Sequence, residues 1–180
     1  MKKITLLLVT IVTLTSCSKE SVEQLSEEAL TSNPINTTND RREEPGPSID
    51  PIVTDLIAGQ NEIVGTVTVE TDGTTINVTY NTINGWEIDA THLYVGDCES
   101  RPANNPGNPL IGQFPYKEIH NSGTTEYMYS ISSAEVGCSG CVAAHAEVRD
   151  INGGTETAWA DGLPYGGSSW AMYFEYNFCQ

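Results

Sequence analysis

The sequence has few basic residues, because only 8 Lys and Arg accompany 24 Asp and Glu among 180 residues. The resulting formal net charge of −16 excludes the basic surface that neutralises phosphates, so no nucleic acid is expected as a partner. Beyond the N-terminus, no apolar run approaches the roughly 20 residues that a membrane-spanning helix needs. The chain also lacks a phosphate-binding glycine loop, a Gly-x-Ser-x-Gly elbow and a His-Glu-x-x-His pair. No cofactor is therefore predicted.

The N-terminus has the features of an export signal. A positive Met1-Lys2-Lys3 precedes the apolar segment 4–14, whose length of about 11 residues suits a signal peptide and is too short to span a bilayer. The segment ends in Leu14-Thr15-Ser16-Cys17, which resembles the lipobox of bacterial lipoproteins. The resemblance implies a signal peptide over 1–16, cleavage before Cys17, and acyl chains such as palmitate on Cys17 that hold the protein on a membrane. The alternative is an ordinary signal peptide with an incidental cysteine.

The segment that follows Cys17 is polar. Residues 18–23, Ser-Lys-Glu-Ser-Val-Glu, loosely resemble the acidic export signal of Bacteroidetes surface lipoproteins. This resemblance implies a lipid-anchored location in the outer membrane, at the cell surface, with a periplasm-facing anchor as the alternative. Residues 17–58 as a whole are rich in Ser, Glu, Asn, Thr and Pro, a composition that buries too little apolar surface to fold, and we interpret them as a flexible tether.

From residue 59 the pattern changes to short alternating runs. In the run 74–80, for example, Ile76, Val78 and Tyr80 share one face. Asp72-Gly73 separates this run from 62–70 and predicts a hairpin. Similar runs cover 92–95, 127–131, 142–148 and 170–178. Because no helical period is sustained, residues 59–180 are predicted to be all-β, an antiparallel β-sandwich of jelly-roll or immunoglobulin-like type.

Several segments of this region carry a second resemblance. They are 85–88, 91–96, 107–109, 112–116, 143–146, 156–160 and 170–174. Taken together, these segments resemble a domain that recurs in secreted and surface bacterial proteins. The resemblance implies an extracytoplasmic β domain and assigns no catalytic residue.

Four cysteines remain once Cys17 carries lipid: Cys98, Cys138, Cys141 and Cys179. An exported chain is expected to pair them in two disulfides, with three connectivities open. We favour one bridge from Cys98 and one from Cys179, each to a member of the Cys138/Cys141 pair, since a bridge within that pair would close little loop entropy. The rival interpretation is a metal site, because Cys138-x-x-Cys141-x-x-x-His145 has the spacing of ligands, with Cys98 or His92 to complete it.

Two histidines lie in strand-like runs. His92 and His145 are expected to be hydrogen-bonded structural residues, although a His–His contact or a His–carboxylate pair would titrate near neutral pH. His120 lies in a turn-rich segment and carries no signal.

Aromatic residues suggest sugar binding, because aromatic rings stack on pyranose rings. Tyr165, in the Gly-Leu-Pro-Tyr-Gly-Gly loop, and Tyr173, opposite the apolar face of the last strand, are predicted to be exposed and to contact a ligand. Trp170 shares the apolar face of that strand and is expected to pack in the core.

The sequence therefore favours a non-enzymatic binding or structural domain, anchored to a membrane by lipid, with a glycan or another envelope protein as partner. The alternative is a small glycan-active hydrolase, which needs two carboxyl groups about 5–10 Å apart in a cleft. The candidates for such a pair are Asp89, Asp97, Glu99, Glu118, Glu147, Glu156 and Asp161.

Overall fold

The computed structural model describes residues 49–180. The predicted signal peptide 1–16, the predicted lipid attachment at Cys17 and the first part of the predicted tether lie outside the described residues. Within 49–180, no helix has both the length and the apolar character that a membrane crossing requires.

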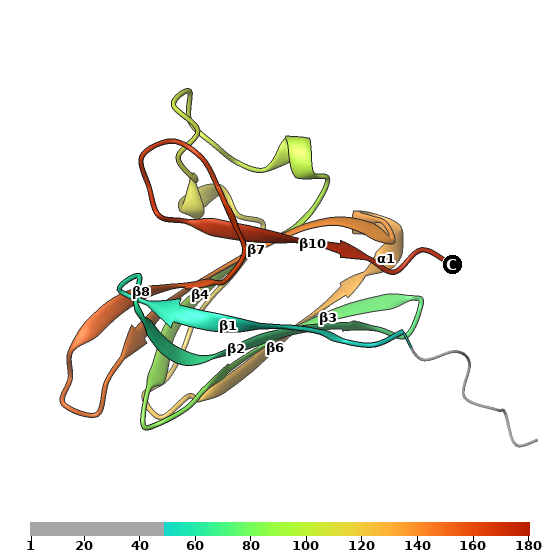
Figure 1. The fold of residues 1–180 in the computed structure, drawn as a ribbon. Coiled ribbons are helices and arrows are strands. Elements are labelled where there is room, and N and C mark those ends of the chain that lie inside the picture. Colours follow the sequence, from blue (N-terminus) through green and yellow to red (C-terminus); the bar gives the residue numbers. More distant parts are fainter. Residues whose placement is uncertain (1–48) are drawn as a thin grey trace, which may run out of the picture. The chain divides into compact units, whose positions relative to one another are not determined.

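This region is built from antiparallel strands and very short helices (Figure 1). The strands are β1 (Ile52–Ala58), β2 (Glu62–Thr71), β3 (Thr75–Thr82), β4 (Glu87–Gly96), β5 (Tyr116–Ile119), β6 (Glu126–Ser132), β7 (Ser139–Arg149), β8 (Thr155–Ala160), β9 (Leu163–Pro164) and β10 (Met172–Asn177). The helices are the 3₁₀ turns η1 (Cys98–Ser100) and η2 (Ile111–Gln113) and the single turn α1 (Ser133–Val136). The prediction of an all-β antiparallel domain is confirmed.

One continuous sheet provides both layers of the sandwich, in the order β5-β4-β7-β8-β1-β2-β3-β6. The branch point is β7, which pairs along one edge with β4 and along the other first with β10 and then with β8. Figure 1 shows β1, β2, β3 and β6 running below β7 and β10. The sheet curls until its two edge strands approach each other, so that the rings of Tyr116 on β5 and Tyr129 on β6 lie 6.2 Å apart.

The core lies between the two layers and follows the strand period of two. Along β3 the buried residues alternate with half-buried ones, and Ile76, Val78 and Tyr80 point inward as predicted. The β2–β3 hairpin is also confirmed. At its turn, Gly73 has a φ of 90°, which suits glycine. The carboxylate of Asp72 accepts hydrogen bonds from the backbone N–H groups of Thr74 and Thr75 at 2.8 and 2.7 Å, which lowers the pKa of Asp72.

The folded region begins earlier than predicted. Strand β1 falls within 17–58, where we expected only tether, and it pairs with both β2 and β8. Leu56 and Ala58 on this strand are buried in the core. The boundary at residue 59 is therefore wrong, because the segment 52–58 is rich in β-branched and apolar side chains, which overrides the polar composition of the residues before it.

Candidate functional site

Strand β7 is buried on both faces. One face packs in the core between the two layers, and the opposite face, which we call the outer face, is covered as well. Ala144, Ala146 and Val148 face the core, whereas Ala143 and His145 point to the opposite side. There a second apolar cluster packs on the sheet and draws side chains from loops as well as strands. We call it the outer cluster; its buried members are Tyr94, Phe114, Ala143, Trp159, Tyr165 and Ala171.

Two disulfides join the elements around this face. Cys98 is bonded to Cys141 and Cys138 to Cys179, with sequence separations of 43 and 41. The favoured pairing, one bridge from Cys98 and one from Cys179, is thus confirmed. Since Cys98 opens the loop 98–115 that supplies Phe114 to the outer cluster, its bridge fastens this covering loop to β7.

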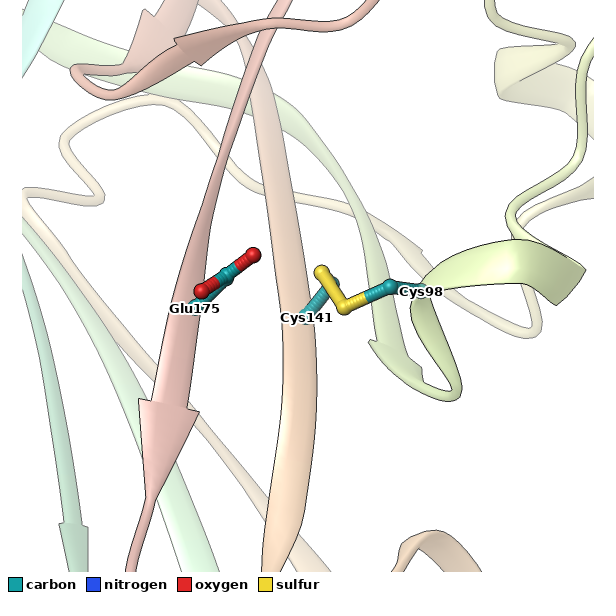
Figure 2. A group of neighbouring side chains, drawn as sticks. All are labelled: Cys98, Cys141 and Glu175. Atoms are coloured by element: carbon teal, nitrogen blue, oxygen red, sulfur yellow. A yellow bond between two sulfur atoms is a disulfide. The ribbon is translucent and has the colours of Figure 1, made fainter.

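The disulfides also bear on the rival interpretation, in which the cysteines bind a metal ion. Cys98, Cys141 and Glu175 have side-chain atoms within 4.8 Å of one another. Figure 2 shows Glu175 on β10 beside the bridge. Metal ligation by cysteine requires thiolates, and both sulfurs here are bonded to each other. The cysteine-based metal site is therefore wrong.

The predicted ligand-binding tyrosines are covered. Tyr165 is only 5% exposed and donates a hydrogen bond to the carbonyl of Pro102 at 2.9 Å. Burial raises the pKa of its hydroxyl to about 12. Tyr173 is half-buried, and the guanidinium carbon of Arg101 lies 3.9 Å from the centre of its ring and 5.2 Å from that of Tyr165. The predicted exposure of Tyr165 is wrong, because the loop that carries it folds back over Phe114.

Other aromatic rings do not form an open platform either. The 8 Tyr, 3 Trp and 3 Phe residues of the chain are all buried or half-buried. Trp170, expected in the core, is instead half-buried against the outer cluster, because it precedes β10 and lies among the covering loops.

Beyond the outer cluster, the strand register brings chemically active side chains together. Residues directly opposite one another on neighbouring strands project to the same side of a sheet. One such row across β5, β4, β7 and β8 contains Lys117, His92, His145 and Trp159, and the next contains Ile119, Ala90, Glu147 and Thr157. Cationic, imidazole and carboxylate groups thus share one face.

These rows border a cleft of about 400 Å³, which we call the outer-face cleft. Its lining residues are Asp89, Ala90, His92, Ile119, His120, Glu147 and Arg149. Ala90 has the shortest side chain and lies between its longer strand neighbours, Ile119 and Glu147. Ile119 is 85% exposed. The Nε atom of Arg149 donates to Asp89 Oδ2 at 3.1 Å, and a second contact joins the other ends of the pair.

At one side of this cleft, two histidines face each other. The Nδ1 atoms of His92 and His145 are 3.3 Å apart, and the His145 ring packs 4.9 Å from that of Trp159. Burial lowers the pKa of His145 to about 3, with a smaller contribution from the neighbouring His92. Burial also lowers the pKa of His92. The expectation that both histidines are hydrogen-bonded is confirmed, since they bond each other. The alternative, in which such a pair titrates near neutral pH, is wrong for His145, because burial penalises the charged imidazolium.

No sequence pattern marks His120, which the structure brings to the same cleft. Its Nε2 atom is 2.8 Å from Thr91 Oγ1, and its ring lies 4.4 Å from that of Tyr127. Burial lowers its pKa. Only the pairing of β5 with β4 could have revealed this neighbourhood, because His120 immediately follows β5 and has no periodic pattern around it.

The predicted carboxylates do not converge in one cleft. Asp89 and Glu147 line the outer-face cleft, Glu156 lines a second of about 360 Å³, and Asp97 a third of about 530 Å³. Glu99, Glu118 and Asp161 line none of these three.

The second cleft also contains Trp86, which is only 7% exposed. Asp150 in this cleft accepts hydrogen bonds from the backbone N–H groups of Asn152 and Gly154, at 2.7 and 2.9 Å. The Asp150 carboxylate therefore stabilises a turn. The ring of Trp86 is too buried to stack on a ligand.

No family model, no curated protein and no solved structure matches the chain. The function is accordingly inferred from the geometry of the chain's own residues.

Proposed function

We propose that this chain is an exported, lipid-anchored β-sandwich protein of the outer membrane, displayed at the cell surface, whose domain binds a ligand without catalysing a reaction. The observation that carries the binding role is the outer-face cleft. The groups that surround the small Ala90 there are the imidazoles of His92 and His120, the carboxylates of Asp89 and Glu147, and the guanidinium of Arg149. Polar groups held on strands beside a packed cover are preorganised for recognition. The two disulfides support export, because such bonds persist in oxidising compartments.

A glycan is the proposed ligand, and another envelope protein is the alternative partner. The groups of the cleft supply both hydrogen-bond donors and acceptors for sugar hydroxyls. The Asp89–Arg149 pair is fixed by two contacts, which orients several of these groups. Since the aromatic rings are buried or half-buried, hydrogen bonds rather than broad ring stacking would carry recognition.

The second candidate, a glycan-active hydrolase, depends on Asp89 and Glu147, which line the same cleft. Its chemistry needs one carboxyl group to transfer a proton and the other to act as base or nucleophile. The ion pair with Arg149 occupies Asp89, and this favours the binding role over the enzyme.

Export and anchoring are tested in intact cells. Metabolic labelling with a fatty acid should mark the wild-type chain and not Cys17→Ala, and protease added to whole cells should remove the domain. Unlabelled wild-type protein in the soluble cell extract would contradict the anchor, and survival during protease treatment would contradict surface display.

Ligand binding is tested on glycan arrays with the detergent-solubilised full chain. Ala90→Leu fills the outer-face cleft and should abolish binding. Val53→Leu, at an exposed position of β1 outside that cleft, is the matched control and should bind like wild type. Binding that survives in Ala90→Leu would contradict this site. Release of reducing sugar from a bound glycan, lost in Glu147→Gln, would favour the hydrolase instead.

A further inference from the structure

The arrangement of His92 and His145 allows more than the hydrogen bond between them. The two residues are register partners on β4 and β7, so the strand pairing itself holds their side chains on one face. Their closest nitrogens, Nδ1 and Nδ1, are 3.3 Å apart. This is close to the separation of about 3.3–3.4 Å that two imidazole nitrogens have on one tetrahedral ion, since metal–nitrogen bonds are about 2.0–2.1 Å long.

The two rings are also suited to ligation by their environment. His145 is 3% exposed and packed against Trp159, so its orientation is fixed before any ion arrives. His92 is half-buried and lines the outer-face cleft, which gives an ion a route from solvent. Neutral imidazole is the form that binds metals.

We propose that His92 and His145 form a binding site for a divalent transition-metal ion, with water at the remaining positions. The site does not depend on the proposed export or on glycan binding. Among residues 49–180, the Cys98, Cys141 and Glu175 group is the one set of three donors that converges within 4.8 Å, so the histidines act as a two-ligand site. Glu147, which borders the same cleft, adds a favourable negative charge.

The ligand chemistry predicts which ion binds best. Imidazole suits zinc, copper and nickel, and among divalent ions of this series copper binds most tightly to a given set of nitrogen ligands. Cu²⁺ is therefore the most sensitive probe, and Zn²⁺ should bind the same pair more weakly.

The experiment uses the full chain without a histidine tag, titrated with Cu²⁺ and followed by calorimetry and electron paramagnetic resonance. His92, His120 and His145 are the 3 histidines of the sequence, so each imidazole that binds Cu²⁺ can be assigned by single substitutions. Wild type should bind one ion with splitting from two nitrogens. His92→Gln, at a half-buried position, should bind at least tenfold more weakly and lose one nitrogen. His120→Gln is the matched control and should bind like wild type.

Three results would overturn the site: no nitrogen splitting in the wild-type spectrum, equal affinity in His92→Gln, or loss of binding in His120→Gln. The wild-type spectrum needs no variant, so it remains decisive if a substitution impairs folding. A chain that binds Cu²⁺ in this way but carries no lipid would contradict the proposed anchor and leave the metal site intact.

Discussion

The two faces of β7 are buried by different means. Its inner face joins the core through Ala144, Ala146 and Val148, and the other members of that core come mostly from strands. Its outer face is covered by the outer cluster, in which Phe114, Tyr165 and Ala171 come from loops and are far from β7 in the sequence. The inner core is largely aliphatic, whereas the outer cluster is largely aromatic.

The difference shows that two burial mechanisms operate on one strand. The inner face needs only alternation along each strand and correct register. The outer face needs long loops to return to the sheet, and a disulfide fastens one of them. Because both faces of β7 are buried from Cys141 to Ala146, burial does not alternate along this part of the strand as it does along β3.

The largest expected effect comes from removing a large side chain on each face. Leu93→Ala in the inner core should cost about 2–5 kcal/mol, and Phe114→Ala in the outer cluster about 3–5 kcal/mol. Both side chains are at most 1% exposed, so each truncation leaves a cavity. Urea unfolding with the disulfides intact measures both losses. A cost below about 1 kcal/mol for Phe114→Ala would mean that the outer cluster is only a loose cover.

Removing each disulfide sharpens the same comparison. The separations of 43 and 41 residues are nearly equal, so chain entropy predicts nearly equal losses of about 2–4 kcal/mol for each Cys→Ala pair. Replacing Cys98 and Cys141 should additionally speed amide hydrogen exchange in the covering loop 98–115. Replacing Cys138 and Cys179 should do so near the C-terminus. Identical exchange patterns in the two variants would contradict separate roles.

Acid should weaken the outer face through His145. The folded state keeps His145 neutral down to pH about 3, whereas the unfolded chain protonates it below about 6.5. The unfolded state therefore binds more protons in this window, and stability falls as pH drops. Between pH 7 and 5 the loss due to this residue is about 2 kcal/mol.

Other titratable and charged groups near His145 also affect the pH dependence, so a variant is needed as a control. His92 faces it from β4 and its pKa is lowered too, so it adds to the same trend; Lys117 on β5 and Glu147 on β7 are the nearby charges that act on His92. Urea unfolding of wild type and His145→Gln at several pH values should give a flatter profile for the variant. Parallel profiles would show that His145 is not the group responsible.

The smallest expected effect concerns the cation above the tyrosines. Arg101→Lys removes the planar guanidinium that lies over Tyr173 and should cost about 0.5–1 kcal/mol. Lys117→Ala, an exposed cation on β5, is the comparison and should stay within about 0.5 kcal/mol of wild type. Thermal unfolding measures both. Equal stability of Arg101→Lys and wild type would mean that the stacked arrangement adds nothing to the outer face.

Some features followed from local sequence because local rules control them. Asp72-Gly73 predicted the hairpin, since few residues adopt the backbone angles of such a turn. Alternation predicted the buried face of β3, and loop-closure arguments disfavoured a bridge within the Cys138/Cys141 pair. Which member of that pair bonds Cys98 and which bonds Cys179 was left to the tertiary structure. Strand β1 was missed because its polar N-terminal neighbours dominated the composition, and the short β5 because four residues carry little periodic signal.

The amino-acid order by itself determined the antiparallel strands, the inner core and the class of cysteine pairing, because these depend on spacing along the chain. Only the tertiary structure decided the fate of Tyr165, the neighbourhood of His120 and the 3.3 Å approach of His92 to His145. Those outcomes depend on which strands pair and which loops return to the sheet. Such contacts join residues that are distant in sequence, and no local pattern records them.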